Sequence, residues 1–249
     1  MRVCIIIPMF NEEKSARQSV ETIISYVKEL SLPTTVLIIN DGSSDATQKI
    51  VQELISQDST ILKMITHPKN QGYGSAIRTG IQFACANNYD YALFMDSDLT
   101  NHPRYLKDVY QKMQEGHDYI KANRYGLGGG IEGVLLSRKI VSKVGNGLAR
   151  WLFRIPLQDL TNGFRAVKVS ILKQLELTES GFAIIMEELL LAKPLVHSYA
   201  QVPYILTSRK SWQGQTHFKY DIKTYRLYFQ YALKSAGVQK PLMSKGNPV

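Results

Sequence analysis

The sequence predicts an α/β fold in which a mostly parallel β-sheet is flanked by helices. Two observations carry this prediction. In the first 125 residues, short runs rich in β-branched and aromatic residues alternate with longer stretches whose apolar residues recur at helical spacing. In addition, 249 residues with 44% hydrophobic content are enough for one sizeable core. We therefore expect a single domain over residues 1–236, with halves at 1–125 and 126–236, followed by a flexible tail at 237–249.

The first half is expected to wind doubly around its sheet. Strands are predicted at residues 3–8, 35–39, 62–66, 91–95 and 119–122. Helices are predicted between them at residues 12–30, 45–56, 74–87 and 103–115. Ligands of such sheets gather at the carboxyl ends of the strands, so the residues that directly follow each strand are the candidates for function.

Charge and cysteine content narrow the class of protein. A formal net charge of +9 favours a polyanionic partner, which is nucleic acid, an anionic membrane surface or a phosphorylated small molecule. The chain has no RNA-binding aromatic signature, zinc finger or helix-turn-helix pattern, so no nucleic-acid partner is expected. Cys4 and Cys85 lie in apolar segments that suggest neither a disulfide nor a zinc site. No apolar stretch reaches the roughly 20 residues of a membrane span and no secretory signal is recognised, which favours a cytoplasmic location.

Polar residues follow the first two predicted strands. Pro8, Phe10 and Glu12 lie between the first strand and a helix start, an arrangement that an ordinary strand-to-helix turn also explains. Asn40 and Asp41 end the second strand. A carboxylate at such a strand end can accept hydrogen bonds from a base or a ribose, and this is the reading favoured for Asp41.

Two glycines, Gly72 and Gly74, precede the third predicted helix. They would allow a ligand to approach the backbone closely beside exposed amide donors. The spacing matches neither a dinucleotide-binding fingerprint nor a P-loop, so simple helix–sheet packing explains it equally well.

The fourth strand is followed by two carboxylates, Asp96 and Asp98, with Ser97 between them. In an extended chain, residues two apart face the same side. Paired carboxylates repel unless a cation lies between them, and their hard oxygen atoms suit Mg²⁺ or Mn²⁺. Such an ion would bridge a pyrophosphate and act as a Lewis acid for a departing nucleoside diphosphate. The alternative is that both acids are solvated and cap the next helix.

Seven motifs, in order, resemble the dolichyl-phosphate mannosyltransferase group of family 2 glycosyltransferases: IPMFNEE, INDGSSD, NQGYGSA, MDSDLTNHP, NRYGLGGG, SRKIVSK and DLTNGFRA. The resemblance covers residues 3 to 210 and implies a GT-A fold. It also implies a GDP- or UDP-linked sugar donor of the mannose or glucose type, Mg²⁺ or Mn²⁺, and inversion at the sugar carbon. The implied acceptor is a polyprenyl phosphate at the cytoplasmic face of a membrane, in cell-envelope or glycan biosynthesis.

The resemblance assigns roles to individual residues. It implies that the donor contacts Pro8, Phe10, Glu12, Asn40, Asp41, Gly74, Asp96, Ser97 and Arg209. Asp96 and Asp98 would hold the metal, and Arg124, Arg138 and Ser142 would hold the acceptor phosphate. Asp98, Arg124 and Arg138 are the expected catalytic residues. The sequence departs from the family pattern at Phe10 (commonly tyrosine), Asn40 (an acid) and Thr100 (a metal-binding glutamine), which leaves nucleotide choice and metal affinity open.

Acceptor chemistry also favours a phosphate. A phosphomonoester with a second pKa near ~6 is largely dianionic at neutral pH and needs no strong general base. An alcohol acceptor would need one, and Asp159, Glu187 and Glu188 are the candidates. With a phosphate acceptor, Glu187 would orient its neighbours or touch the sugar, and Glu188 would face solvent. Transfer to a hydroxyl of a glycan or small molecule, nucleotidyl transfer and a non-catalytic scaffold remain the competing functions.

Two amphipathic stretches are predicted in the second half. In residues 133–154, one face is apolar and its neighbours are basic; the apolar residues are Leu135, Val141, Val144, Leu148, Trp151 and Leu152, and the basic ones are Arg138, Lys139, Lys143, Arg150 and Arg154. Such a helix would lie on a membrane surface without spanning it, unless it packs on the domain's own sheet. Residues 219–234 interleave tyrosines with basic residues and would lie at the same interface, in a homodimer contact or in the core.

Overall fold

The computed structural model describes residues 1–209 and 222–237, apart from the side chains at 137, 138, 222 and 223. One large sheet has the strand order β3-β2-β1-β4-β7-β5-β8. Its strands are β1 (Val3–Met9), β2 (Thr34–Asn40), β3 (Leu62–Thr66), β4 (Tyr91–Phe94), β5 (Tyr119–Asn123), β7 (Arg165–Lys168) and β8 (Tyr199–Pro203). All neighbouring strands pair in parallel except β7, which is antiparallel to β4 and β5. The predicted fold class, a mostly parallel sheet flanked by helices, is confirmed.

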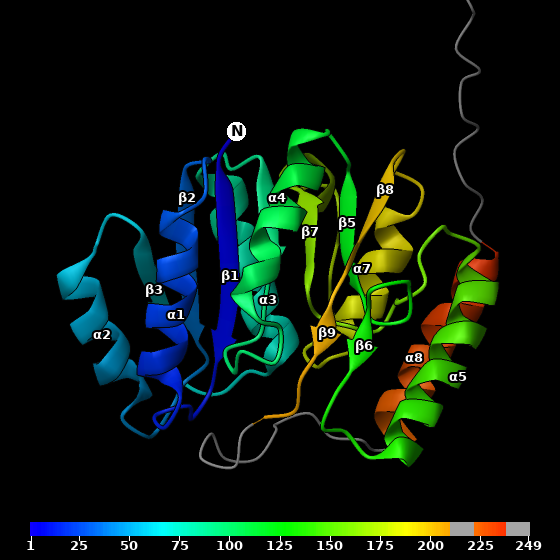
Figure 1. Cartoon of the computed structure of the whole chain (residues 1–249), viewed down its shortest axis with the longest axis horizontal. Coiled ribbons are helices and arrows are strands. Elements are labelled where there is room, and N and C mark those ends of the chain that lie inside the picture. The colour runs from blue at the N-terminus through cyan, green and yellow to red at the C-terminus, as the bar shows by residue number, and fades with distance from the viewer. Residues whose placement is uncertain (210–221, 238–249) are drawn as a thin grey trace, which may run out of the picture.

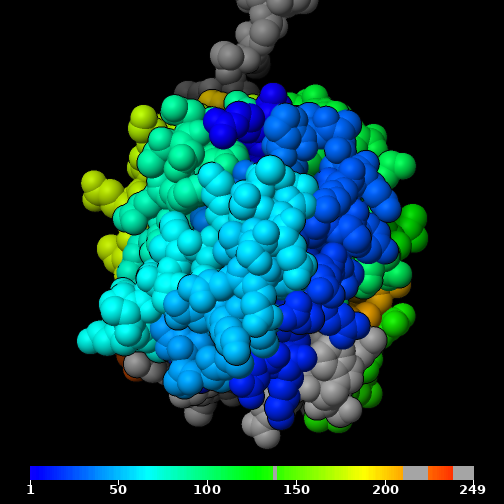
Figure 2. Space-filling model, turned by 90° about the vertical axis from the view of Figure 1, so that its left-hand side faces the viewer, coloured from blue at the N-terminus to red at the C-terminus, as the bar shows by residue number. Residues whose placement is uncertain are grey.

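Helices cover both faces of this sheet (Figure 1). On one face lie α1 (Ala16–Lys28), α2 (Thr47–Gln57) and α4 (Leu106–Gln114), the last preceded by a short 3₁₀ helix, η1 (Pro103–Tyr105). On the other lie α3 (Tyr73–Ala86), α6 (Val169–Leu172) and α7 (Ile184–Ala192). Figure 2 views the molecule from the side of α2 and shows that N-terminal segments, in blue and cyan, make up most of this face.

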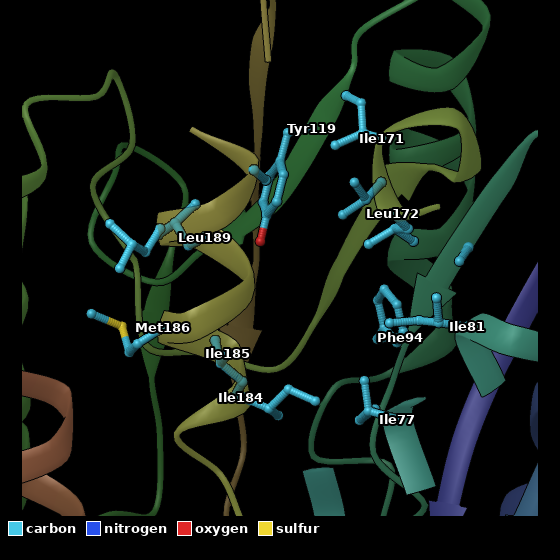
Figure 3. Close-up of a cluster of buried hydrophobic side chains, with 14 of the residues drawn as sticks. Ile77, Ile81, Phe94, Tyr119, Ile171, Leu172, Ile184, Ile185, Met186 and Leu189 are labelled. Carbon is cyan, nitrogen blue, oxygen red and sulfur yellow. The ribbon is translucent and has the colours of Figure 1, made fainter. Parts of the chain in front are cut away.

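The core has two layers because successive residues of a strand point to opposite faces. In β1, Ile5 and Ile7 pack under α1 and α4, whereas Cys4 and Ile6 pack under α3. Figure 3 shows part of the second layer, in which Ile77 and Ile81 of α3 and Phe94 of β4 lie in the same buried cluster as the apolar residues of α7.

The remaining elements form an outer part beside the sheet. A two-stranded ladder joins β6 (Gly130–Ile131) to β9 (Ile205–Leu206). The long helix α5 (Leu136–Phe153) packs along α8 (Ile222–Ala236), and both stand at the edge of the molecule (Figure 1). α8 also contacts α7, which ties the pair to the core.

The five strands predicted in the first half are confirmed to within one residue at each end. The first helix begins at Ala16 rather than at residue 12, because residues 11–15 form a turn in which the backbone N–H groups of Ser15 and Ala16 donate to the Glu12 carbonyl. The helix expected over residues 103–115 is divided into η1 and α4. The tail predicted at 237–249 lies, beyond Gly237, outside the described residues.

Candidate active site

A cleft of about 1510 Å³ opens where β1, β2 and β4 end. Ten of the residues expected at the site line it: Pro8, Phe10, Glu12, Asp41, Asp96, Ser97, Asp98, Arg124, Ser142 and Arg209. Asn40 and Gly74 are not among its lining residues, and the side chain of Arg138 lies outside the described part of the chain. The folded chain therefore brings residues from position 8 to position 209 to one place.

Asp96 and Asp98 follow β4 and are held differently. The amide Nδ2 of Asn101 donates to Asp96 Oδ2 at 2.6 Å. Asp98 Oδ1 accepts two hydrogen bonds from Thr100, one from its backbone N–H at 3.0 Å and one from its hydroxyl at 2.7 Å. Burial, and after it the charge of the neighbouring Asp98 carboxylate, raise the pKa of Asp96 to about 7, against the opposing effect of the hydrogen bond from Asn101.

Arg209 reaches this acid pair from the far end of the chain. Its guanidinium forms an ion pair with Glu12, and its Nε lies 3.4 Å from Asp98 Oδ2. Glu12 also accepts a hydrogen bond from the hydroxyl of Ser15 at 2.8 Å. The Arg209 guanidinium thus lies between the carboxylates of Glu12 and Asp98, which follow two different strands. Its positive charge lowers the repulsion between these two carboxylates.

The donor atoms at this point fit a hard divalent cation. No three histidine, cysteine, aspartate or glutamate side chains gather as a metal site within the described residues. However, Mg²⁺ is commonly held by one or two carboxylates together with water and substrate phosphates, so the pair Asp96 and Asp98 is sufficient. The side-chain oxygen Oδ1 of Asn101, beside Asp96, is buried and has no hydrogen-bond partner among the described residues. This oxygen is therefore another atom that fits a metal ligand.

Asp41 supports a loop as well as lining the cleft. Its Oδ1 lies 2.7 Å from His67 Nδ1 and accepts a hydrogen bond from the backbone N–H of Gln71 at 2.9 Å. Its Oδ2 accepts from the N–H of Gly72 at 2.8 Å. The carboxylate expected to meet a base or ribose therefore also holds the loop before α3. The sequence does not identify His67 as the partner of Asp41, because the two residues are 26 positions apart.

The structure corrects two expected donor contacts. Asn40 is fully buried, and its Oδ1 accepts a hydrogen bond from the backbone N–H of Ser43 at 3.2 Å. Gly74 permits a close approach, but of protein and not of a ligand. Its N–H donates to the Ser180 carbonyl at 2.7 Å, and a Cβ at this position would clash with the Glu179 carbonyl oxygen. This contact favours packing over ligand approach at Gly74, and the packing is against the loop at residues 179–180 rather than against the sheet.

Arg124 is locked by a buried carboxylate. Its Nε lies 2.6 Å from Asp159 Oδ2 and its Nη2 lies 2.8 Å from Asp159 Oδ1, a bidentate ion pair. The Asp159 side chain is fully buried, whereas the Arg124 side chain keeps some exposure to the cleft. Nη2 also donates to the hydroxyl of Thr161 at 3.2 Å. The guanidinium is therefore preorganised at the cleft wall.

A hydrogen-bonded cluster joins α5 to the loop after it. The hydroxyls of Ser142 and Tyr125 lie 2.7 Å apart. Asn146 is buried in α5, where its Oδ1 accepts from the backbone N–H groups of Leu160 and Thr161 and its Nδ2 donates to the Thr161 hydroxyl. Sequence reasoning overlooked Asn146. The available signal was an asparagine inside a predicted helix, where its side chain competes with the backbone for hydrogen bonds.

Glu188 is fully buried, and the expectation that it faces solvent is wrong. It forms an ion pair with the fully buried Arg165, with Arg165 Nε 2.7 Å from Glu188 Oε1. In its helix, α7, every residue except Leu191 is buried, so position 188 faces the core. Glu187 accepts hydrogen bonds from the backbone N–H groups of Thr178 and Glu179 and so orients the loop before its helix. Orienting its neighbours was one of the two roles expected for Glu187.

Lys121 of β5 is a further buried charge that the sequence analysis did not select. Its Nζ donates to the Asn162 carbonyl at 2.8 Å. Burial, and after it the charge of Arg165, lower the pKa of Lys121 to about 7, against the attraction of Asp159 and Glu188. Four buried charged residues thus lie at the segment over residues 159–165: Lys121, Asp159, Arg165 and Glu188.

Apolar side chains of α5 are exposed, and several of them, Val141, Val144 and Leu148 among them, also line the cleft. The exposed side chains include Leu135, which precedes the helix, and Leu136, Ile140, Val141, Val144, Leu148 and Trp151 within it. Trp151 is 69% exposed, while Leu152, expected on the same face, is only 6% exposed and packs in the core. Among residues 1–209 and 222–237, no helix is both long and apolar enough to cross a membrane.

Two named enzymes are similar in sequence to this chain over most of its length. A dolichol-phosphate mannosyltransferase of Pyrococcus furiosus is 28% identical over 235 residues, which cover 91% of this chain and 64% of the relative. The chain thus spans less than two thirds of that relative's length. A polyprenol monophosphomannose synthase of Mycolicibacterium smegmatis is 26% identical over 212 residues, which cover 84% of this chain and 78% of the relative.

A similar fold occurs in solved structures. Glucosyl-3-phosphoglycerate synthase from Mycobacterium tuberculosis, in complex with Mn²⁺, UDP and glucosyl-3-phosphoglycerate, superposes with a TM-score of 0.65. The match covers 96% of this chain and 81% of the other at 19% identity, which supports the GT-A fold alone. The model of the family described as glycosyl transferase family 2 matches residues 4–176. With more than half of its length matched, this chain belongs to glycosyl transferase family 2.

Proposed function

We propose that the chain transfers a hexose from a nucleotide-sugar to a polyprenyl phosphate at the cytoplasmic face of a membrane, with inversion at the sugar carbon and with a divalent cation. One observation carries the proposal. A single cleft contains the acid pair with Arg209, the locked Arg124, and apolar side chains of α5 and α8. An acceptor with a phosphate head and an apolar chain matches that combination. The names of the two enzymes that resemble the chain support the same acceptor class.

The donor end would be formed by the strand-end residues. Asp96 and Asp98 would hold Mg²⁺ or Mn²⁺, which when bound supplies Lewis-acid neutralisation of the leaving diphosphate. Arg209, between Glu12 and Asp98, is placed to exchange one of these carboxylates for a phosphate oxygen. Pro8, Phe10 and Asp41 would line the nucleotide. UDP and GDP donors are both compatible with these residues.

The ion pairs and hydrogen bonds of the three candidate bases favour a phosphate acceptor over a hydroxyl acceptor. A hydroxyl needs a base within hydrogen-bond reach. The three candidates are each engaged elsewhere: Asp159 with Arg124, Glu188 with Arg165, and Glu187 with the backbone at residues 178–179. A phosphate dianion needs no such base. We therefore assign Arg124 to the acceptor phosphate, together with Ser142, which lines the same cleft, and Arg138, which is on the same helix as Ser142.

The proposed reaction is a direct displacement. The acceptor phosphate oxygen attacks the anomeric carbon on the face opposite the nucleoside diphosphate, and one displacement inverts the configuration. Arg124 lowers the repulsion between the anionic nucleophile and the anionic donor, an electrostatic contribution of the oxyanion-hole kind. Because Asp159 fixes the guanidinium beforehand, little reorganisation is needed when the acceptor arrives.

The exposed face of α5 supports peripheral membrane attachment. Its apolar side chains stand beside Lys139, Lys143, Arg150 and Arg154, so apolar burial and attraction to anionic lipids would act together. Trp151→Glu should reduce co-sedimentation with vesicles of anionic phospholipid, while Gln52→Glu on the exposed side of α2 should not. If a homodimer covers this face instead, the wild type will sediment as a dimer and will not bind vesicles.

The function is tested by a transfer screen. Purified protein is incubated with Mn²⁺ and each of several GDP- and UDP-sugars, with a short polyprenyl phosphate, the matching polyprenol or a free sugar as acceptor. We expect product only with the phosphate. Arg124→Ala should reduce transfer at least 100-fold with a smaller effect on donor binding, whereas Arg17→Ala, which removes an exposed ion pair, should have no effect. Equal transfer to polyprenol or a sugar hydroxyl would contradict the proposal.

A further inference from the structure

Asn101 lies between the acid pair and η1 and has one amide atom without a role. The residue is only 2% exposed and is one of the residues that line the cleft. Its Nδ2 donates to Asp96 Oδ2 at 2.6 Å. Its Oδ1 is buried and has no hydrogen-bond partner within the described part of the chain.

The orientation of this amide follows from its contact. Reversing it would bring its oxygen to 2.6 Å from the Asp96 oxygen, which is repulsive when Asp96 is ionised. Oδ1 therefore points away from that oxygen. A buried carbonyl oxygen left unpaired costs about 1–3 kcal/mol, so proteins rarely keep one without water, an ion or a function to explain it.

The neighbouring Thr100 is oriented toward the other acid of the pair. Thr100 turns its hydroxyl and its backbone N–H to the same atom, Asp98 Oδ1. Thr100 thus acts as a support for Asp98. Asn101 supports Asp96 with one end of its amide and keeps the other end, a neutral oxygen, beside the pair.

We propose that Asn101 is a third protein ligand of the divalent cation, binding through Oδ1 while its Nδ2 orients Asp96. This inference rests on the proposed function only in that the acid pair holds a cation. Amide oxygens are ordinary ligands of hard cations. A neutral third ligand also suits the charge balance, because the two carboxylates already match a divalent ion and a further anion would oppose the donor's diphosphate.

Metal binding, measured without turnover, distinguishes a ligand from a support. Mn²⁺ affinity is measured by electron paramagnetic resonance of the free ion at pH 8, with the metal alone and with UDP or GDP. Asn101→Leu removes the oxygen and should weaken Mn²⁺ binding at least tenfold. Asn101→Asp keeps an oxygen and adds charge, so it should bind Mn²⁺ more tightly than the wild type. If Asn101 only orients Asp96, both variants will bind more weakly.

A sulfur ligand gives a second and independent readout. Asn101→Cys replaces a hard donor with a soft one, so the ratio of Cd²⁺ to Mg²⁺ affinity should rise at least tenfold relative to the wild type. Cys4 and Cys85 are present in both proteins and cancel in this comparison. Gln52→Glu, which adds a charge on exposed α2, should change neither measurement. An unchanged ratio in Asn101→Cys would overturn the inference.

The two proposals fail in different ways. If the wild type binds no Mn²⁺ with or without a nucleoside diphosphate, the cation requirement of the proposed function fails. If the wild type binds Mn²⁺ and both Asn101→Leu and Asn101→Cys bind metals as the wild type does, only the role of Asn101 fails. Should Asn101→Leu not fold by circular dichroism, the aspartate and cysteine variants still decide the question.

Discussion

The ion pair between Arg165 and Glu188 allows a sharp prediction about stability. Both side chains are fully buried. Arg165 donates from Nε to Glu188 Oε1 at 2.7 Å and from Nη1 to the Gly163 carbonyl at 2.8 Å, and its guanidinium lies 4.1 Å from the ring centre of Phe94. Glu188 Oε1 also accepts from the hydroxyl of Tyr119 at 2.9 Å. Removal of either partner leaves the other charge buried and unpaired.

Glu188→Leu should lower the free energy of unfolding by about 3–5 kcal/mol, the usual cost of breaking a buried pair on one side. For a domain of this size, each kcal/mol corresponds to about 2–4 °C, so the Tm should fall by about 6–20 °C. Glu188→Gln keeps the shape and some hydrogen bonds and should lie between Glu188→Leu and the wild type. The double variant Arg165→Met/Glu188→Leu removes both charges and should recover most of the loss, because apolar replacement of a whole pair is often neutral or stabilising.

Urea denaturation followed by circular dichroism measures these four proteins and the single variant Arg165→Met. The cycle of wild type, Arg165→Met, Glu188→Leu and the double variant gives the coupling energy between the two positions. Activity is not needed for this test. The reasoning is refuted if Glu188→Leu costs less than about 1 kcal/mol, the range of an exposed pair. It is also refuted if the double variant is no more stable than Glu188→Leu.

Three further predictions concern positions around the cleft. Asn146→Leu leaves two loop N–H groups unpaired and should destabilise the protein by about 2–3 kcal/mol, while raising the KM for the acceptor more than that for the donor in steady-state assays. Because burial lowers the pKa of Lys121 to about 7 from an unfolded value near ~10.4, the unfolded state binds the extra proton between these values and stability rises with pH. From pH 7 to pH 9 the wild type should therefore gain up to about 2–3 kcal/mol relative to Lys121→Met in urea denaturation, and an equal pH dependence would contradict this. Gly74→Ala should destabilise the protein by about 1–3 kcal/mol because its Cβ meets the Glu179 carbonyl, whereas Gly147→Ala, with open space around it in α5, should stabilise it by about 0.5–1 kcal/mol; similar Tm values for both would refute the packing argument.

Local patterns were sufficient for the first half of the fold. The strand predicted at residues 62–66 is β3 with the same bounds, and the acids at Asp96 and Asp98 were expected directly after the fourth strand, where they occur. These features depend on runs of β-branched residues, on helical spacing and on the rule that ligands meet strand ends. β7 was missed because four residues carry no clear period, and its antiparallel place between β4 and β5 depends on pairing with distant segments.

The sequence by itself determined the fold class, the family and the strand-end acids, because these depend on neighbours along the chain. Only the tertiary structure decided which polar side chains reach the cleft. Asn40 and Asp41 are adjacent, yet one turns into the core and the other lines the cleft. Arg209 meets Glu12 across 197 residues, and Glu188 of helix α7 pairs in the core with Arg165 of strand β7. Long-range packing sets such contacts, and no local period records it.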